Sequence, residues 1–196
     1  MTEFVSAVLG LSFASGLNAY ATILGLGLMQ RFGMIQLPPG LDVVASTPVI
    51  AGAAVLYVVE FVADKVPLID NVWDGIHTVI RPVAGAWLAY GAIGNVAPQW
   101  QTLAALAGGS IAFTSHAAKA STRLAVNASP EPFSNWILSF GEDALSLFLV
   151  WLATSHPLLA IAIVLVLVSI AIYIVWKLSH FARRAFRWIS NSAHML

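Results

Sequence analysis

The sequence predicts an all-α integral membrane protein with about six transmembrane helices. Of its 196 residues, 59% are hydrophobic and only 9% are charged, whereas soluble domains carry about 25% charged residues. Several apolar runs also approach the roughly 20 residues that a helix needs to cross a bilayer. A soluble fold of this size could not cover its surface with so few polar side chains.

Charge and cysteine content exclude several classes of function. The formal net charge is zero, so the chain has no basic excess with which to bind nucleic acid. It contains no cysteine, which excludes disulfides, thiolate metal sites and cysteine nucleophiles. No positive n-region or cleavage signal accompanies the first apolar run, so we expect a retained membrane helix there.

The first apolar segment covers about residues 4–29 and is interrupted by small and polar residues, among them Gly16, Asn18 and Tyr20. Small residues permit close packing of membrane helices. The alternative is that Asn18 and Tyr20 line a polar cavity or that the helix breaks near Gly16. Residues 30–48 are expected to form a loop that contains Pro38-Pro39-Gly40.

The second span is expected at about 49–63, and residues 68–81 follow it with an amphipathic helical pattern. This segment could lie at the membrane surface, re-enter the membrane or pack in the bundle. Pro82 suits the first position of a helix, so a third span is predicted at 83–96.

Three more spans complete the prediction, at about 102–126, 136–154 and 158–176, with a turn-rich connection at 127–135. Residues 1–176 would form one transmembrane domain. Residues 177–196 would form a basic amphipathic tail in the cytoplasm.

Charged residues gather where these apolar spans end. The stretch 60–81 alone holds four of the nine acidic residues. A charged side chain next to the apolar interior of a membrane is energetically costly, so it usually serves a function. The candidate substrate-binding or ion-coupling residues are Asn18, Glu60, Asp64, Lys65, Asp70, Asp74, His77, Arg81, His116, Lys119, Arg123, Glu142 and Asp143.

The distribution of basic residues predicts the orientation. With six spans and both termini in the cytoplasm, eight of the nine basic residues lie on or near the cytoplasmic side, and Arg31 lies outside. This bias follows the positive-inside rule. We therefore expect a multi-pass protein of the bacterial inner membrane.

Two blocks, 49–96 and 102–154, share a layout of span, charged end, connector and span, which suggests an internal two-fold repeat. Many transporters place their site at the interface of such repeats. The charges of the two blocks are complementary in sign. They could pair only to hold the bundle together, or they could line a polar cavity open to the cytoplasm.

Four stretches are similar to a family of small bacterial membrane proteins that is catalogued only as a domain of unknown function. These are E-F-V-A-D-K-V-P-L-I-D at 60–70, H-T-V-I-R-P-V-A-G at 77–85, the motif at 116–135 and E-D at 142–143. S-G-L-N-A-Y at 15–20 also fits. The resemblance differs at one position, because we expect many relatives to have arginine where this chain has Asn18. The resemblance implies an integral membrane protein and supplies no activity.

The leading functional hypothesis is a small transporter or permease-like protein for an anionic or lipid-phosphate substrate, with proton coupling. Lys119, Arg123 and Arg81 would neutralise the anion, and Glu60, Glu142 or His116 would carry the proton. The alternatives are an intramembrane enzyme that acts on lipid and a non-catalytic scaffold. The predicted partners are the lipid bilayer, an anionic small molecule or lipid, and further copies of the chain.

No catalytic residue or cofactor is identified in the sequence. His77 and His116 lie near carboxylates that could bind a metal. However, neither the H-E-x-x-H nor the H-x-x-E-H spacing is present, and we expect no metal.

Overall fold

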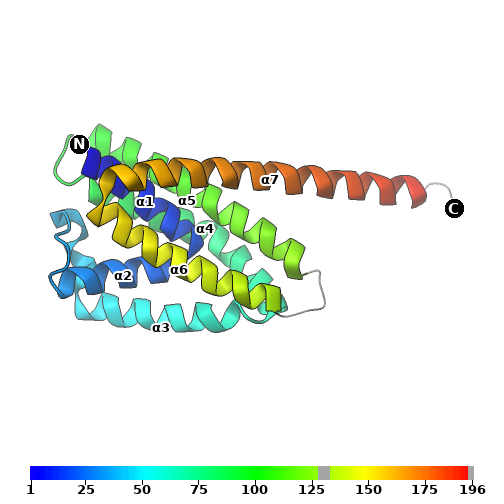
Figure 1. The fold of residues 1–196 in the computed structure, drawn as a ribbon, viewed down its shortest axis with the longest axis horizontal. Coiled ribbons are helices and arrows are strands. Elements are labelled where there is room, and N and C mark those ends of the chain that lie inside the picture. The colour runs from blue at the N-terminus through cyan, green and yellow to red at the C-terminus, as the bar shows by residue number, and fades with distance from the viewer. Residues whose placement is uncertain (128–132, 194–196) are drawn as a thin grey trace.

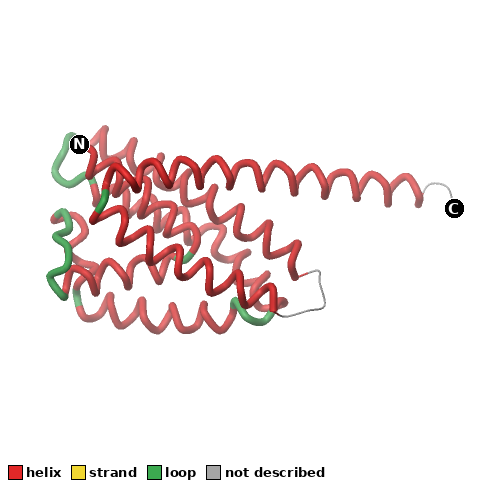
Figure 2. Tube along the Cα trace, in the orientation of Figure 1, coloured by secondary structure: helices red, strands yellow, loops and turns green. Residues whose placement is uncertain are grey.

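The computed structural model describes residues 1–127 and 133–193, and all regular structure within these ranges is helical. The helices are α1 (Thr2–Leu17), α2 (Ala19–Arg31), the short 3-10 helix η1 (Pro39–Ala45), α3 (Thr47–Ala63), α4 (Pro67–Ala92), α5 (Pro98–Asn127), α6 (Phe133–Ser155) and α7 (Pro157–Ala193). They pack as a single bundle from which the C-terminal half of α7 projects (Figure 1). Short connections join the helices at the two ends of the bundle (Figure 2).

The first apolar segment is not one helix but a hairpin of two. Asn18 has extended backbone angles (φ −151°, ψ 103°) and separates α1 from α2. Its side chain accepts a hydrogen bond from the Ala21 amide at 2.8 Å, so it caps α2 as Asn commonly does at a helix start. The prediction of one helix over this segment is therefore wrong, and the alternative of a break near Gly16 is confirmed, with the break two residues later at Asn18.

The hairpin changes where the termini lie. Figure 1 shows α1 entering the bundle from the N-terminal end and α2 returning toward that same end. Each of α3 to α7 then runs the length of the bundle in alternating directions. The two termini therefore lie at opposite ends, whereas six full spans would have placed both at one end.

Helix α4 departs from the prediction at Pro82. The residues 68–81 are helical as predicted, but Pro82 lies inside α4 and does not begin a new helix. Proline in a helix removes one backbone hydrogen bond, and membrane helices tolerate this when neighbouring helices pack closely. Close packing is present one turn later, where no side chain would fit at Gly85 or Gly108 between α4 and α5.

Helix α7 likewise continues through the expected boundary at residue 176 without a break. Most of the predicted connection 127–135 and the end of the tail (194–196) lie outside the described residues.

Within the described parts of the chain, two helical segments, Phe133–Ser155 and Pro157–Arg184, are long and apolar enough to cross a membrane. A third candidate arises if η1 and α3, which meet at a bend of 65°, are counted as one span. Six spans are therefore not established by length and composition. In α4 and α5, charged residues and uncharged polar residues such as Gln99 and Gln101 together lower the mean hydropathy of these longer helices.

The interior of the bundle is divided into an apolar half and a charged half. Toward the N-terminal end, the core contains Leu11, Leu26, Leu41, Leu88 and Leu152, all essentially fully buried. Toward the α3–α4 turn, the buried residues are mainly charged or polar. The apolar half holds the helices together and positions the charged half.

Candidate functional site

A buried cluster of charged side chains, here called the charged core, fills the half of the bundle near the α3–α4 turn. Four helices and the α1–α2 break contribute to it. Its acidic members are Glu60, Asp64, Asp70, Asp74, Glu142 and Asp143, and its basic members are Arg81, Lys119 and Arg123. The two histidines His77 and His116 and the amides Asn18 and Asn135 complete it.

Helical periodicity explains this arrangement locally. Asp70, Asp74, His77 and Arg81 recur at intervals that keep them on one face of α4, and all four are buried. The opposite face of α4 exposes Leu68, Val72, Ile76, Val79 and Val83. The helix is therefore amphipathic with its charged face turned inward, the reverse of a helix on a soluble protein.

Arg81 lies at the centre of the first half of the charged core and is fully buried. Its Nη2 donates to Glu60 Oε1 at 2.6 Å, and its Nη1 donates to Asp74 Oδ1 at 3.2 Å. Nη1 also lies 3.5 Å from the Gly16 carbonyl at the end of α1. One guanidinium therefore joins α3, α4 and the tip of the α1–α2 hairpin.

Lys119 connects the same hairpin to three carboxylates. Its Nζ lies 3.1 Å from Asp64 Oδ2, 3.3 Å from Glu142 Oε2 and 3.7 Å from Glu60 Oε1. It also donates to the Leu17 carbonyl, the last residue of α1, at 3.1 Å. The free carbonyls at a helix C-terminus favour a cation, so α1 directs its negative end at Lys119.

Arg123 organises the outer half of the charged core. It pairs with Asp64 and Asp70 at 3.0 Å each and with Glu142. It also donates to the Asp64 carbonyl at 2.8 Å and to Asn135 Oδ1 at 3.2 Å. Burial by itself would raise the pKa of Asp64, but the positive charges of Lys119 and Arg123 outweigh burial and hold this pKa below its ordinary value.

The hydrogen bonds of the two histidines require a neutral ring only at His116. His77 Nδ1 donates to the Trp73 carbonyl at 2.8 Å, and Nε2 lies 3.1 Å from the Tyr20 hydroxyl. His116 Nδ1 accepts from Arg81 at 2.8 Å, since an arginine can only donate. Its Nε2 is left to donate to Thr78 Oγ1 at 3.1 Å.

Asn18 and Asp143 join the hairpin tip to α6. Asn18 Nδ2 donates to Asp143 Oδ1 at 2.8 Å, and the Tyr57 hydroxyl lies 3.4 Å from Asp143 Oδ2. Neither partner is charged. Asp143 is thus a buried carboxyl that makes no ion pair with the residues the structure describes.

Lys65 is the one predicted site residue that stands apart. Its Nζ donates to the Phe61 carbonyl at 2.9 Å and lies over the Phe61 and Phe140 rings. It contacts Ser139 Oγ at 3.3 Å and makes no ion pair within the described ranges. Burial lowers its pKa. All other predicted site residues lie together in the charged core.

The charged core holds more acid than base. Among the described residues, six carboxyls face three cations there. Three carboxylate oxygens, Glu60 Oε2, Asp64 Oδ1 and Asp74 Oδ2, are buried without any hydrogen-bond partner in the described chain. An unpaired buried charge is unfavourable, so these oxygens are suited to take up protons or another positively charged species.

Sequence reasoning missed several polar contributors. On α6, Asn135, Ser139 and Ser146 are buried together with the predicted Asp143, and the four recur every four, four and three residues. This polar stripe on an apolar helix was a usable signal. Thr78, in contrast, looked like an ordinary α4 residue and is identified only by its contact with His116.

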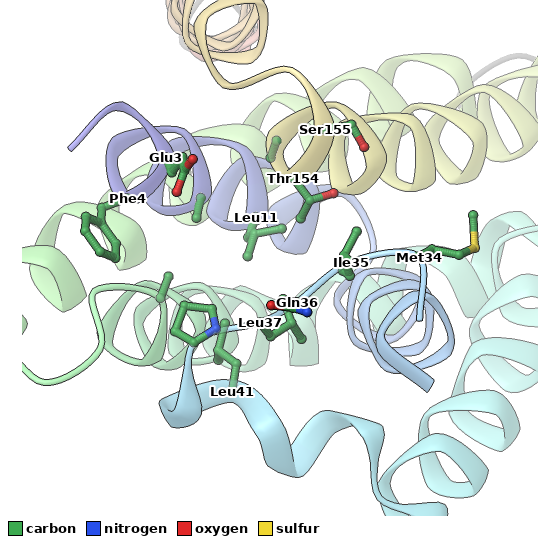
Figure 3. Close-up of a pocket in the computed structure, with 14 residues that line it drawn as sticks. Glu3, Phe4, Leu11, Met34, Ile35, Gln36, Leu37, Leu41, Thr154 and Ser155 are labelled. Carbon is green, nitrogen blue, oxygen red and sulfur yellow. The ribbon is translucent and has the colours of Figure 1, made fainter. Parts of the chain in front are cut away.

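The surface of the bundle has a groove beside the charged core and a pocket at the opposite end. A groove of about 180 Å³ between α4 and α5 is lined by Asn71, Asp74, Gly75, Thr78, Ala120 and Leu124, so it reaches the charged core at Asp74. A pocket of about 260 Å³ lies at the other end, between α1, the segment after α2 and the end of α6 (Figure 3). That pocket contains none of the predicted site residues.

The arrangement of His, Asp and Glu side chains among the described residues does not indicate a metal site. Within the ranges 1–127 and 133–193, no group of three or more His, Asp or Glu side chains is placed to hold a metal ion. The carboxyls of the charged core are instead drawn toward Arg81, Lys119 and Arg123.

Comparison with known proteins gives a family without an activity. No curated protein and no solved structure matches the chain. One family model does match, and it covers residues 5–177, which include every member of the charged core. The chain therefore belongs to the family described as "Domain of unknown function (DUF4126)".

Proposed function

We propose that this protein is a small multi-pass membrane transporter that moves protons through the charged core. One observation carries the proposal. Three buried carboxylate oxygens lack a partner within the described chain, in a cluster where carboxyls outnumber cations. A buried polar atom without a partner is unfavourable, and a bound proton would turn such a carboxylate into a neutral carboxyl.

The surface of the bundle supports a bilayer environment. Large apolar side chains are exposed along α3, α4, α5, α6 and α7, while the charges of α3 to α6 face inward. A water-soluble protein rarely exposes such continuous apolar surface. At about 1.5 Å per residue, α4, α5 and α6 are each long enough to cross the ~30 Å hydrocarbon core, despite their charged residues.

This environment gives a revised topology. In our proposal α3 to α7 cross the bilayer, and the α1–α2 hairpin enters and leaves from one side. By the positive-inside rule, the basic residues of α7, including Lys177, Arg183 and Arg184, favour a C-terminus in the cytoplasm of a bacterial inner membrane. The N-terminus then lies outside. Single cysteines placed at the two ends of this cysteine-free chain should react with an impermeant thiol reagent from opposite sides.

Protons fit the charged core better than the anionic substrate that the sequence suggested. Arg81, Lys119 and Arg123 each contact at least two carboxylates, so an anion would have to displace them. Of the charged core's buried atoms without a partner in the described chain, three are carboxylate oxygens and one, Arg81 Nε, is a donor. A proton is also smaller than any other cation and needs no coordination shell of several ligands.

The carboxyls are better proton carriers than His116. This ring accepts from Arg81, and a proton on it would set two cations against each other. Glu60 is the best-placed carrier. Its Oε1 faces Arg81 at 2.6 Å and Lys119 at 3.7 Å, while its Oε2 is unpartnered.

A proton on Glu60 would weaken its hold on both cations. Arg81 and Lys119 also contact the carbonyls that end α1. Proton binding would therefore be transmitted to the tip of the hairpin. Broken membrane helices occupy comparable places in many secondary transporters.

Proton flux into proteoliposomes tests the proposal. The purified protein is reconstituted with an internal pH-sensitive dye, and a potassium diffusion potential drives protons inward. We expect rapid acidification with the wild type and a rate near that of protein-free vesicles with Glu60→Gln. Glu3→Gln, at an exposed position, is the matched control and should behave as the wild type. A wild-type rate equal to that of empty vesicles would refute the proposal.

Oligomerisation and binding of an anionic lipid remain predictions. A scaffold function is separable, since removal of residues 177–196 would abolish it and leave proton flux intact. An intramembrane enzyme would require a reaction that the present contacts do not indicate.

A further inference from the structure

We infer that the groove between α4 and α5 is the opening through which water and protons reach Asp74 and, beyond it, the charged core. This inference rests on the proposed proton transport and adds the route of access. Of the core's charged residues, Asp74 alone lines that groove.

Asp74 faces both the groove and the buried network. Its residue is 5% exposed, and its Oδ1 contacts Arg81 at 3.2 Å. Its Oδ2 is buried and has no partner among the residues described. A carboxyl with one oxygen held by an arginine and the other unpartnered beside a groove is suited to receive a proton from outside.

A continuous set of polar contacts leads inward from this point. Arg81 holds both Asp74 and Glu60, so the two carboxyls share one guanidinium. Thr78, which also lines the groove, contacts His116, and His116 in turn contacts Arg81. A change of charge at Asp74 would therefore be felt at Glu60 through one residue.

The position of the groove fits an opening at the charged end of the bundle. Asp74 lies seven residues after the start of α4, which corresponds to about 10 Å along the helix. In the proposed topology this depth is close to the cytoplasmic surface. A volume of about 180 Å³ has room for several water molecules, and Asn71, Asp74 and Thr78 offer them polar partners.

Gly75 keeps the groove open. A Cβ atom built at Gly75 would meet nothing within 4 Å, so a larger side chain fits there without displacing a neighbour. Gly52 on α3 is equally open, but it does not line the groove. The pair Gly75→Leu and Gly52→Leu therefore fills space at two exposed helical glycines, and only the first change narrows the groove.

The test uses dicyclohexylcarbodiimide, a lipid-soluble reagent that adds to protonated carboxyls and leaves a stable N-acylurea. The full chain in liposomes is treated with the reagent, and peptide mass spectrometry locates the adduct. We expect Asp74 to be modified in the wild type and in Gly52→Leu, and modification to fall to background in Gly75→Leu. Proton flux should fall in parallel in Gly75→Leu alone.

The two readouts separate the inference from the proposed function. Equal modification of Asp74 in Gly75→Leu and the wild type would overturn the access route, as would modification of Glu60 or Asp64 with Asp74 untouched. Protection of Asp74 by Gly75→Leu in a protein without proton flux would support the groove and refute transport. Gly75→Ser, a smaller change, should leave modification of Asp74 at the wild-type level and guards against a folding defect in the leucine variant.

Discussion

Because acid exceeds base in the charged core, removing a cation should destabilise the protein more than neutralising a carboxylate. Lys119→Met and Glu142→Gln test this difference, since Lys119 Nζ and Glu142 Oε2 lie 3.3 Å apart in one ion pair. Each variant breaks that same contact and keeps a side chain of similar size. If ion pairing were balanced, the two losses of stability would be similar.

The contacts of each residue set the magnitude. Removing one partner of a buried ion pair costs about 3–5 kcal/mol. After Lys119→Met, Asp64 and Glu142 both keep their ion pairs with Arg123. The expected loss of unfolding free energy is therefore about 3 kcal/mol, the lower end of that range. The Leu17 carbonyl also loses its lysine donor. After Glu142→Gln, Lys119 keeps Asp64, and Arg123 keeps Asp64 and Asp70. The neutral amide oxygen can still accept from both cations, so the expected loss is only about 0.5–1.5 kcal/mol.

Equilibrium unfolding in mixed micelles, followed by the fluorescence of the seven tryptophans, measures both losses. Arg31→Met serves as a control at the far end, where an exposed Arg31 donates to Thr47 Oγ1. It should change the free energy of unfolding by less than about 1 kcal/mol. A loss for Glu142→Gln that equals or exceeds that of Lys119→Met would refute the reasoning about excess acid.

Three further predictions follow from individual contacts. Asn18→Ala should lower the free energy of unfolding by about 2–4 kcal/mol in the same assay, because it removes the cap of α2 and the amide that satisfies Asp143; a change below 1 kcal/mol would contradict this role. The pKa of Asp64 is lowered in the folded protein. The extra stability of the wild type over Asp64→Asn should therefore be fully present above about pH 4 and should decline as pH falls through the folded pKa. Unfolding curves of both proteins at several pH values would measure this. Truncation after Trp176 should preserve proton flux in liposomes, because no member of the charged core lies in the tail, and a loss of flux would contradict this separation.

Local sequence patterns were sufficient for the helices and for most members of the site. The intervals between Asp70, Asp74, His77 and Arg81 already indicated one face of a helix, because helical periodicity depends only on nearby residues. The complementary signs of the two blocks also left pairing between them as one possibility. The structure shows such a pair between Arg123 of α5 and Asp70 of α4, at 3.0 Å.

Boundaries and turns were less predictable, since they depend on contacts between distant residues. Asn18 interrupts an apolar run that is long enough for one span, and its partner Asp143 lies 125 residues away in the chain. Pro82 looked like a helix start, but packing of α4 against α5 carries the helix through it. Both differences alter the path of the chain, and the first moves the termini to opposite ends.

By itself, the sequence determined that this is a helical, strongly apolar chain with charge confined to a few faces, because composition and periodicity are local properties. Only the tertiary structure decided which charges meet and which are left over. Arg81, Lys119 and Arg123 are distributed among six carboxyls, and Glu60, Asp64 and Asp74 each keep an oxygen without a partner in the described chain. That balance is a property of the packed bundle, since a carboxyl gains or lacks a cation only when helices far apart in sequence come together.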